Sequence, residues 1–250
     1  KAEKQGITKK QNVSTKKERK KIGQFFTSAN TAQYMASLFK IPNKEHITIL
    51  DPGTGTGILS AALVERVLKH NENIFVELTC YEVDENVLPV LQENLHHMKS
   101  IYGDRLDIIL KQEDYILSQA DDFNHDIFEA REAKKWDIVI SNPPYFKMNN
   151  NSKTNDSLTK TISRHELKLT FEELAYCSSQ LLKQKGHFYF IHRTDRLIEI
   201  LRTLREFKLE PKRIRFIHSD NNNSSLFLLD SVYYGREGLK VETPIFLERE

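Results

Sequence analysis

An apolar run, a glycine-rich turn and an amphipathic segment follow one another near residue 50, and this succession constrains the fold more than any other feature of the chain. The run His46-Ile-Thr-Ile-Leu50 leads directly into Asp51-Pro-Gly-Thr-Gly-Thr-Gly57. Residues 58–70 then carry apolar side chains at helical spacing. Glycines between a strand and a helix allow a tight turn and a close approach of the backbone to a ligand. The pattern predicts a nucleotide-binding crossover.

The rest of the chain also alternates between strand and helix patterns. We expect strands over residues 46–50, 74–81, 106–110, 136–141, 187–192, 213–218 and 225–234, and helices over residues 31–39, 58–70, 85–102, 170–184 and 195–207. Residues 136–141 are nearly all apolar, as in a buried parallel strand. The alternation predicts an α/β fold with a doubly wound, Rossmann-like sheet, mostly parallel, that ends in an antiparallel strand pair.

Two carboxylates favour a particular cofactor for the glycine-rich turn, which alone would also fit a Rossmann dehydrogenase. Asp51 stands before Gly53, Gly55 and Gly57, where it can meet the cationic amino-acid part of S-adenosylmethionine directly or through water. Glu82 follows the next strand, where a carboxylate can accept hydrogen bonds from ribose hydroxyls. No Gly-Lys-Ser/Thr sequence follows the turn, which excludes a Walker-type phosphate site.

The third strand ends in a further cofactor-binding candidate, Gln112-Glu-Asp-Tyr115. Asp114 is placed to accept a hydrogen bond from the adenine amino group of the cofactor. Tyr115 or Ile116 would lie against the adenine ring. The alternative is an ordinary surface turn.

The fourth strand closes in Ser141-Asn-Pro-Pro-Tyr-Phe146. Two prolines cannot continue a sheet, so the chain forms a rigid turn at the carboxyl end of the strand, where open α/β sheets bind ligands. A conjugated exocyclic amine becomes more nucleophilic when acceptors hold both of its hydrogens. The Asn142 side-chain oxygen and the Pro143 carbonyl can be those acceptors, and Tyr145 can stack on a planar target. We predict Asn142, Pro143, Pro144 and Tyr145 as catalytic residues and Phe146 as a substrate contact.

The two motifs in this order resemble those of S-adenosylmethionine-dependent methyltransferases that modify adenine N6, which carry D-x-G-x-G-x-G and then [DN]-P-P-[YFW]. The resemblance spans about residues 22–248. It implies a class I methyltransferase sheet, an enzyme that methylates adenine N6 in nucleic acid, and S-adenosylmethionine as its cofactor.

The front half resembles the DNA adenine-N6 methylases of restriction–modification systems. Gly23-Gln-Phe-Phe-Thr27 precedes the first helix, and in those enzymes this segment caps the methionine end of the cofactor. The resemblance therefore implies cofactor-binding roles for Gln24, Phe25, Phe26 and Thr27. The alternative is a hydrophobic segment that simply packs.

The back half is similar instead to the tRNA (adenine-N6) methyltransferases that modify a valine tRNA beside its anticodon. The similarity lies in Ser163-Arg-His-Glu166, His192-Arg193, Arg196-Leu197 and Glu210-Pro-Lys-Arg-Ile214, and in Phe146 after the tyrosine. It implies that Arg164 and His165 touch the substrate, against the alternative of a capping cluster before the helix at residue 170. Those relatives usually lack the Gln-Phe-Phe-Thr opening, so the two halves point to different substrates.

The net charge of +2 conceals an uneven distribution. Residues 1–21 hold nine Lys/Arg and two Glu, whereas the remainder holds 28 Lys/Arg and 33 Asp/Glu. We expect residues 1–21 to be a basic arm, either a solvated extension or a nucleic-acid-binding arm, and residues 22–250 to be a single catalytic domain. Lys212 and Arg213 are predicted to hold phosphate with it; the alternative is a solvated face beside Glu206 and Glu210.

The length of the chain and the way proteins recognise structured RNA both favour RNA as the substrate. A catalytic domain over residues 22–250 leaves no room for the target-recognition domain that DNA methylases of this type append. Structured RNA requires less of the protein because shape and stacking carry much of the recognition. A truncated chain would imitate the same absence, so tRNA is favoured over DNA only modestly. In either case the base must leave its stack to reach Asn142.

Composition excludes several other classes. No apolar run approaches the roughly 18 to 20 residues that cross a bilayer, and no secretory signal opens the chain. Cys80 and Cys177, the only cysteines, exclude a disulfide framework, and with the scattered histidines they form no metal site. We expect a cytoplasmic protein, without a membrane or metal partner, that is a monomer or a weak dimer.

Two rival functions belong to different classes. A protein glutamine-N5 methyltransferase also uses Asn-Pro-Pro-Tyr to hold a planar amide, but the Gln-Phe-Phe-Thr segment and the basic arm count against it. A nonenzymatic RNA-binding protein could keep the fold. It would have no need of Asp51, Glu82, Asp114 and Asn142 together.

Overall fold

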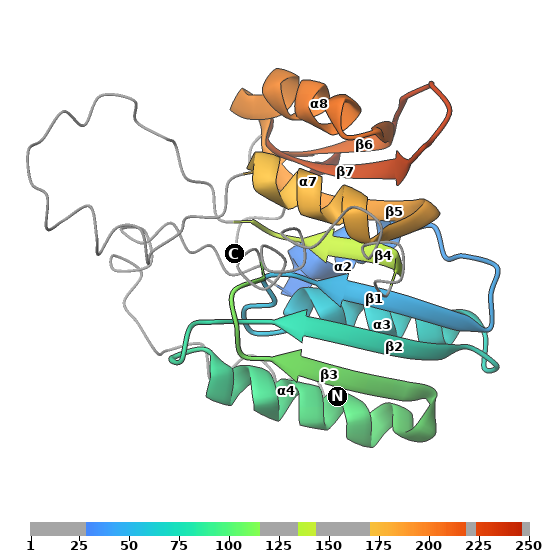
Figure 1. The fold of residues 1–250 in the computed structure, drawn as a ribbon, viewed down its shortest axis with the longest axis vertical. Coiled ribbons are helices and arrows are strands. Elements are labelled where there is room, and N and C mark those ends of the chain that lie inside the picture. Colours follow the sequence, from blue (N-terminus) through green and yellow to red (C-terminus); the bar gives the residue numbers. More distant parts are fainter. Residues whose placement is uncertain (1–28, 116–134, 144–170, 219–223, 247–250) are drawn as a thin grey trace, which may run out of the picture.

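The computed structural model describes residues 29–115, 135–143, 171–218 and 224–246. Its strands form one nine-stranded sheet in the order β3-β2-β1-β4-β5-β7-β6-β8, of which β1 to β7 are labelled in Figure 1, and β9 also pairs with β6. The strands are β1 (His46–Asp51), β2 (Phe75–Tyr81), β3 (Leu106–Lys111), β4 (Trp136–Ser141), β5 (Leu182–Arg193), β6 (Leu209–His218), β7 (Ser224–Tyr233), β8 (Lys240–Val241) and β9 (Ile245–Phe246). The helices are α2 (Ala29–Leu38), α3 (Ile58–His70), α4 (Leu88–Tyr102), α7 (Phe171–Leu181) and α8 (Leu197–Glu206), with short 3₁₀ turns η2 (Gly103–Arg105) and η4 (Thr194–Arg196).

The strand directions confirm the predicted fold class. β1 is parallel to β2 and β4, β2 to β3, and β4 to β5. β7 runs antiparallel to both of its neighbours, β5 and β6. The sheet is therefore mostly parallel and carries the expected antiparallel strands near its C-terminal edge.

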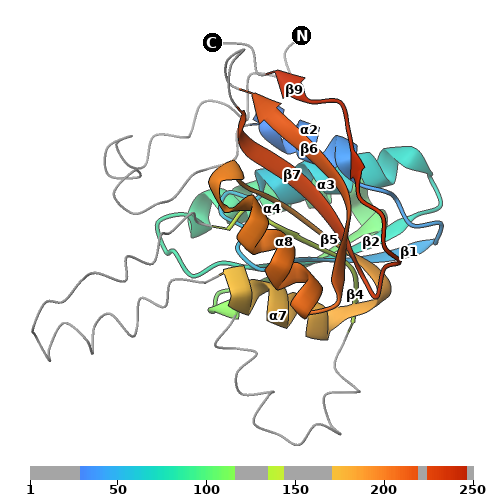
Figure 2. The same cartoon turned by 90° about the horizontal axis from the view of Figure 1, so that it is seen from above.

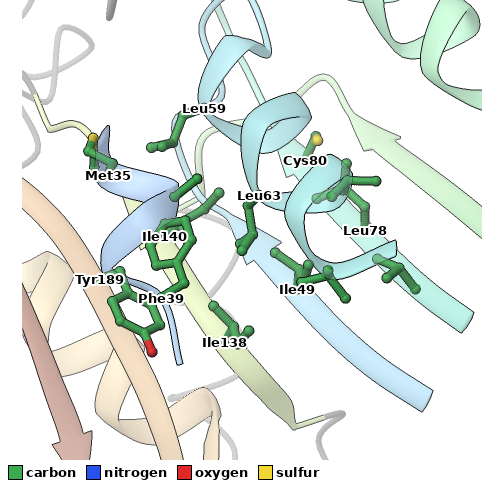
Figure 3. Close-up of a cluster of buried hydrophobic side chains, with 14 of the residues drawn as sticks. Met35, Phe39, Ile49, Leu59, Leu63, Leu78, Cys80, Ile138, Ile140 and Tyr189 are labelled. Atoms are coloured by element: carbon green, nitrogen blue, oxygen red, sulfur yellow. The ribbon is translucent and has the colours of Figure 1, made fainter. Parts of the chain in front are cut away.

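Helices cover both faces of the sheet. α2 and α3 lie on one side, and α7 and α8 lie on the other (Figure 2). Leu59 and Leu63 of α3 belong to one buried cluster with Ile49 and Leu78 of the parallel strands, and Phe39 lies edge-on to Tyr189 at a ring-centroid distance of 4.3 Å (Figure 3). The opposite core is richer in aromatic side chains, among them Phe171, Phe188, Phe190 and Phe227. Burial of these two layers positions the strand ends rigidly.

Several element boundaries differ from the expected ones. The helix expected over residues 170–184 ends at Leu181, and β5 begins at once because Leu182 is buried and pairs with Trp136. β6 begins at Leu209, four residues early, although Pro211 lies within it. The pairing with β7 shifts beside that proline, and such an irregularity tolerates a residue that lacks an N–H.

Other differences are small and local. The helix expected from residue 85 begins at Leu88, with a proline in its first turn, and the helix expected over residues 195–207 is divided into η4 and α8. The two-residue strands β8 and β9 were not predicted, and both pair parallel to β6. Among the described helices, none is long and apolar enough to span a membrane.

Candidate functional site

The strand register brings four predicted site residues to the same edge of the sheet. Asp51 ends β1 and pairs with Cys80 of β2, so Glu82 lies two residues beyond it. On the other side of β1, Leu50 pairs with Val139, which places Asn142 at the corresponding level after β4. Tyr81 pairs with Lys111, and Asp114 follows shortly after β3. The carboxyl ends of these four parallel strands therefore carry the predicted constellation together, where α/β sheets bind ligands.

Asp51 is a buried carboxylate at the centre of this edge. Its side chain is 1% exposed, and Oδ2 accepts a 2.6 Å hydrogen bond from the Ser60 hydroxyl. Oδ1 is buried and has no hydrogen-bond partner within the described part of the chain. Burial raises the pKa of Asp51 to about 7, although Ser60 and the Gly53 amide favour the charged form. Oδ1 is therefore a buried acceptor without a donor among the described residues, and its role in cofactor binding stays a prediction.

The glycine-rich turn has the backbone conformation that its sequence predicts. Gly55 and Gly57 have positive φ angles of 57° and 80°, which favour glycine. A side chain at Gly57 would also collide with Leu91 of α4. Gly53 differs, because a Cβ there would meet no atom of the described residues within 4 Å. The open space at Gly53 leaves its backbone accessible to a ligand.

Two contacts hold this turn to its neighbours. The N–H of Thr54 donates to the Tyr81 carbonyl at 3.0 Å, and the Asn94 side-chain amide donates to the Thr56 carbonyl at 2.7 Å. The turn is thus tied to the end of β2 and to the middle of α4. Such bonds preorganise a loop that must bind a ligand with its backbone.

Glu82 links the ends of β1 and β2. Its Oε2 accepts a 2.7 Å hydrogen bond from the Gly55 N–H, and its Oε1 accepts 2.9 Å bonds from the N–H groups of Val83 and Asp84. A carboxylate has about four acceptor sites, and these bonds leave capacity at Oε2 for a hydroxyl donor. The carboxylate is held in one orientation beside the glycine-rich turn.

Asp114 and Tyr115 occupy different environments at the end of β3. Asp114 is half-buried. Tyr115 is 3% exposed and packs edge-on against Tyr81, with ring centroids 5.3 Å apart. Burial raises the pKa of Tyr115 well above its ordinary value. The structure makes Tyr115 part of the core beneath the site, and the cofactor contacts of both residues stay predictions.

The target-base motif is described at its first positions. β4 is buried along its whole length, Asn142 is half-buried and Pro143 is buried. Nine other predicted site residues lie outside the described residues; these are Pro144, Tyr145, Phe146, Gln24, Phe25, Phe26, Thr27, Arg164 and His165. Their roles stay predictions.

Lys212 and Arg213 have intramolecular partners. The Lys212 ammonium donates to the carbonyls of Arg236, Glu237 and Gly238 at 2.8, 3.3 and 3.0 Å. The Arg213 guanidinium pairs with Oδ2 of the buried Asp230 at 2.9 Å and also donates to the Leu38 carbonyl at the end of α2. Arg213 thus links β6 to β7 and to the end of α2, whereas Lys212 contacts the exposed segment after β7, and phosphate binding by both stays a prediction.

Ser60 and Asn94 also belong to the site, and the sequence motifs did not predict them. Ser60 is fully buried on α3, whose buried face is otherwise apolar. A lone serine within an apolar helical stripe was a usable signal, whereas Asn94 in a polar stretch of α4 gave none. The described residues contain no cluster of three or more His, Cys, Asp or Glu side chains that could hold a metal ion.

Comparison with solved structures identifies the fold. A protein of Listeria monocytogenes named as a class I S-adenosylmethionine-dependent methyltransferase superposes with a TM-score of 0.61 at 12% identity, over 89% of this chain and 67% of the other. The M protein of the type I restriction enzyme EcoKI superposes with a TM-score of 0.52 at 12% identity, over 84% of this chain and 44% of the other. At such identities the likeness shows a common class I methyltransferase fold.

Sequence comparison finds relatives of both kinds that the motifs suggest. The chain is 30% identical over 152 residues to a tRNA1(Val) (adenine(37)-N6)-methyltransferase of Bacteroides thetaiotaomicron, covering 59% of this chain and 52% of the relative. It is 31% identical over 145 residues to the type II methyltransferase M.BsuBI of Bacillus subtilis, covering 58% of this chain and 28% of the relative. The chain thus spans about half the length of the first relative and less of the second.

The family model of the Eco57I restriction-modification methylases matches residues 57–227, which include Glu82, Asp114 and Asn142. The matched segment begins at the last glycine of the turn and ends within β7. It therefore covers more than half of the chain and most of the described sheet. The chain belongs to the Eco57I restriction-modification methylase family.

Proposed function

We propose that this chain is an S-adenosylmethionine-dependent methyltransferase that methylates N6 of adenine in nucleic acid, with tRNA or another structured RNA ahead of DNA. The observation that carries the proposal is the placement of Asp51, Glu82 and Asn142 at the ends of three adjacent strands, β1, β2 and β4. A cofactor-binding half and an amine-binding half then share one edge of the sheet.

The residues present fit the cofactor. Among the described residues, Asp51 offers a buried oxygen without a partner, and Gly53 offers exposed backbone that no neighbouring side chain approaches within 4 Å of its Cβ position. Asp51 would hold the cationic amino-acid part, Glu82 the ribose hydroxyls and Asp114 the adenine amine. When bound, S-adenosylmethionine supplies an electrophilic methyl group carried on a sulfonium.

Asn142 and Pro143 would activate the target amine. The Asn142 side-chain oxygen and the Pro143 carbonyl can each accept one N–H of an adenine amine, which leaves the nitrogen lone pair free to act as nucleophile. This arrangement needs no covalent enzyme intermediate, because positioning and dipolar stabilisation suffice. Tyr145 and Phe146 would stack on the flipped base, as aromatic side chains do on nucleobases.

Named relatives support both nucleic-acid substrates. The Bacteroides relative acts on adenine 37 of a valine tRNA, and a Pedobacter heparinus relative of the same name is 27% identical over 73% of this chain. M.BsuBI and the family model support the DNA alternative. Because the match covers 28% of M.BsuBI, the length of the present chain does not decide between them. We place RNA first because the motifs of the back half, Glu210-Pro-Lys-Arg-Ile214 among them, resemble those of the tRNA (adenine-N6) methyltransferases.

We further propose that residues 1–21 act as a basic arm on phosphate, that residues 22–250 form one catalytic domain, and that the protein works in the cytosol as a monomer or weak dimer. Nine Lys/Arg within residues 1–21 support the arm. The buried, free thiols of Cys80 and Cys177 suit a reducing compartment. Deletion of residues 1–21 should reduce the salt dependence of nucleic-acid binding, and an unchanged dependence would contradict the arm.

The experiment that tests the proposal is a partition of label. The chain is incubated with methyl-tritiated S-adenosylmethionine and, in separate reactions, with bulk unmethylated tRNA, unmethylated DNA and a protein extract. Label in the tRNA fraction would support RNA as the substrate, and label in the DNA fraction would support the DNA alternative. Label in protein would favour the glutamine-N5 alternative, and absence of label from all three would overturn the proposed activity.

A further inference from the structure

Ser60 makes a buried hydrogen bond to the carboxylate of Asp51, and Ser60 belongs to none of the sequence motifs described above. It lies in the first turn of α3, is 0% exposed, and donates from Oγ to Oδ2 of Asp51 at 2.6 Å. Thr54 supports the same residue from the turn, because its hydroxyl donates to the Asp51 main-chain carbonyl at 3.1 Å. The backbone and one carboxyl oxygen of Asp51 are therefore fixed by protein donors.

The two oxygens of Asp51 differ in their surroundings. Oδ2 is bound to Ser60, whereas Oδ1 is buried and has no partner within the described part of the chain. A buried acceptor without a donor is costly, unless the native complex supplies one. Because Ser60 fixes the rotation of the carboxyl group, it also fixes the direction in which Oδ1 points.

We propose that Ser60 is a positioning residue, which directs Oδ1 of Asp51 toward the ammonium group of the bound cofactor, and that Asp51 releases a proton when the cofactor binds. The inference rests on the proposed function, since it concerns the same cofactor site. It adds Ser60, which lies outside the glycine-rich motif, and it accounts for a proton. The neutral carboxyl of Asp51 loses its proton to solvent, and the resulting carboxylate pairs with the ammonium cation.

The groups around Asp51 account for this proton. Burial raises its pKa to about 7, and the nearby Glu82 carboxylate adds to the rise. Cys80 lies on β2 and pairs with Asp51. Its thiol is buried, and burial and Asp51 both raise its pKa, so the thiol stays neutral. From α3, Ser60 lowers the pKa of Asp51, and from the turn the Gly53 amide does the same. Without ligand, a substantial fraction of Asp51 is protonated at neutral pH.

The affinity of the protein for S-adenosylmethionine should depend on pH. A cation binds the ionised carboxylate, so affinity for an ammonium-bearing ligand should rise as pH approaches 7 and should level off above it. Removing the Ser60 hydroxyl removes a bond that favours the ionised form, so the plateau should move to higher pH. A ligand without the ammonium group should show neither effect.

The experiment uses the full chain, its Ser60→Ala and Ser60→Thr variants, and Ser231→Ala as a matched control. Ser231 is also 0% exposed, but its hydroxyl bonds to the Phe188 carbonyl away from this edge of the sheet. Calorimetric titrations between pH 5.5 and 8.5 compare S-adenosylmethionine with 5′-methylthioadenosine, which keeps the nucleoside and lacks the amino-acid part. Two buffers with different ionisation enthalpies give the number of protons released.

For the unmodified chain we expect net proton release and affinity that rises with pH for S-adenosylmethionine, and a flat profile for 5′-methylthioadenosine. Ser60→Ala should bind S-adenosylmethionine about tenfold more weakly at pH 7, with its plateau about one pH unit higher. Ser60→Thr, which keeps the hydroxyl, should restore much of the affinity, and Ser231→Ala should match the unmodified chain.

Three outcomes would overturn the inference. One is an affinity for S-adenosylmethionine that does not change with pH in the unmodified chain. Another is an equal loss for both ligands in Ser60→Ala, since that would indicate a structural role alone. The third, no binding of S-adenosylmethionine at any pH, would remove the proposed function as well. The first two leave methyl transfer intact and are thereby distinguished from the third.

Discussion

The backbone N–H of Gly55 donates a 2.7 Å hydrogen bond to Oε2 of Glu82, which joins the turn after β1 to the end of β2. The residue predicted to hold the ribose is thus also the residue that fixes the glycine-rich turn. Its other oxygen is bound by two further N–H groups, of Val83 and Asp84. One side chain therefore couples the shape of the turn to the nucleoside end of the site.

Replacing Glu82 should weaken cofactor binding in two ways, by loosening the glycine-rich turn and by removing the predicted partner of the ribose hydroxyls. Glu82→Gln keeps the size of the side chain but loses the charge and turns one acceptor into a donor facing N–H groups. We expect S-adenosylmethionine to bind at least tenfold more weakly, because hydrogen bonds to charged groups contribute about 1.5 to 3 kcal/mol each. Titration calorimetry would measure it. Glu113→Gln, at an exposed position near the end of β3, is the control; equal affinities for the two variants would contradict the role of Glu82.

The buried carboxyl of Asp51 should make the ligand-free protein less stable as pH rises. Its pKa is about 7 in the fold against 3.8 for the free group, so the unfolded chain releases the proton first and stability falls between about pH 4 and pH 7. Asp51→Asn removes this loss. Its advantage in unfolding free energy over the unmodified chain should grow by about 2 kcal/mol from pH 5 to pH 8. Urea unfolding at the two pH values checks it, and a pH-independent difference would contradict the shifted pKa.

Asp137 should stabilise the opposite end of β4. It is 3% exposed and accepts bonds from Lys44 at 2.5 Å, Lys183 at 2.8 Å and the Thr48 N–H at 3.0 Å. Burial raises its pKa, but these bonds outweigh burial and leave it at about 2. The stabilisation is present above the unfolded pKa of 3.8 and is lost as pH falls toward 2.

Asp137→Asn should therefore lower the unfolding free energy at pH 7 by about 2 kcal/mol. The deficit should shrink below pH 4, because the carboxyl of the unmodified chain is then being protonated. Asp107→Asn, an exposed aspartate of β3, should leave stability nearly unchanged. Denaturant titrations would measure both variants. A deficit that stays constant down to pH 2 would indicate that the charge of Asp137 is unimportant.

Arg213 should matter to stability. Its partner Asp230 is 1% exposed and also binds Nδ1 of His187 at 2.8 Å, so Arg213→Ala would leave a buried carboxylate short of a cation. We expect a loss of about 2 to 3 kcal/mol, somewhat less than for a fully buried pair because the arginine is partly exposed. Lys212→Ala, beside it, should cost little. Thermal unfolding distinguishes the two, and equal small losses would mean that the ion pair contributes nothing.

Much of the fold could be predicted because its signals are local. The apolar run before Asp51, the glycines after it and the helical spacing over α3 all lie within 25 residues. The parallel strands were found for the same reason, and their order placed Glu82 and Asn142 beside Asp51. The two-residue strands β8 and β9 have no periodicity to detect, and they form because β6 offers an open edge.

The finer chemistry depends on pairings that sequence does not show. Arg213 and Lys212 look like a basic surface in the sequence, and the partner Asp230 lies 17 residues further on, opposite Arg213 only after β6 and β7 have paired. Ser60 is noticeable as a lone serine in an apolar helical stripe, but the sequence does not show its partner, because only the fold of the turn and α3 brings it to Asp51. Tyr115 or Ile116 is predicted to lie against the cofactor, and the burial of Tyr115 against Tyr81 depends on how β2 and β3 align.

The most direct test of the central claim is to identify the methylated product. Bulk tRNA and DNA, each free of adenine methylation, are incubated with the chain and with isotope-labelled S-adenosylmethionine, then digested to nucleosides and analysed by mass spectrometry. We predict labelled N6-methyladenosine from tRNA, and none from Asn142→Ala, which should still bind the cofactor. Labelled N6-methyldeoxyadenosine would assign the DNA alternative. Label on another base or another ring position, or undiminished N6 labelling by Asn142→Ala, would contradict the proposed chemistry.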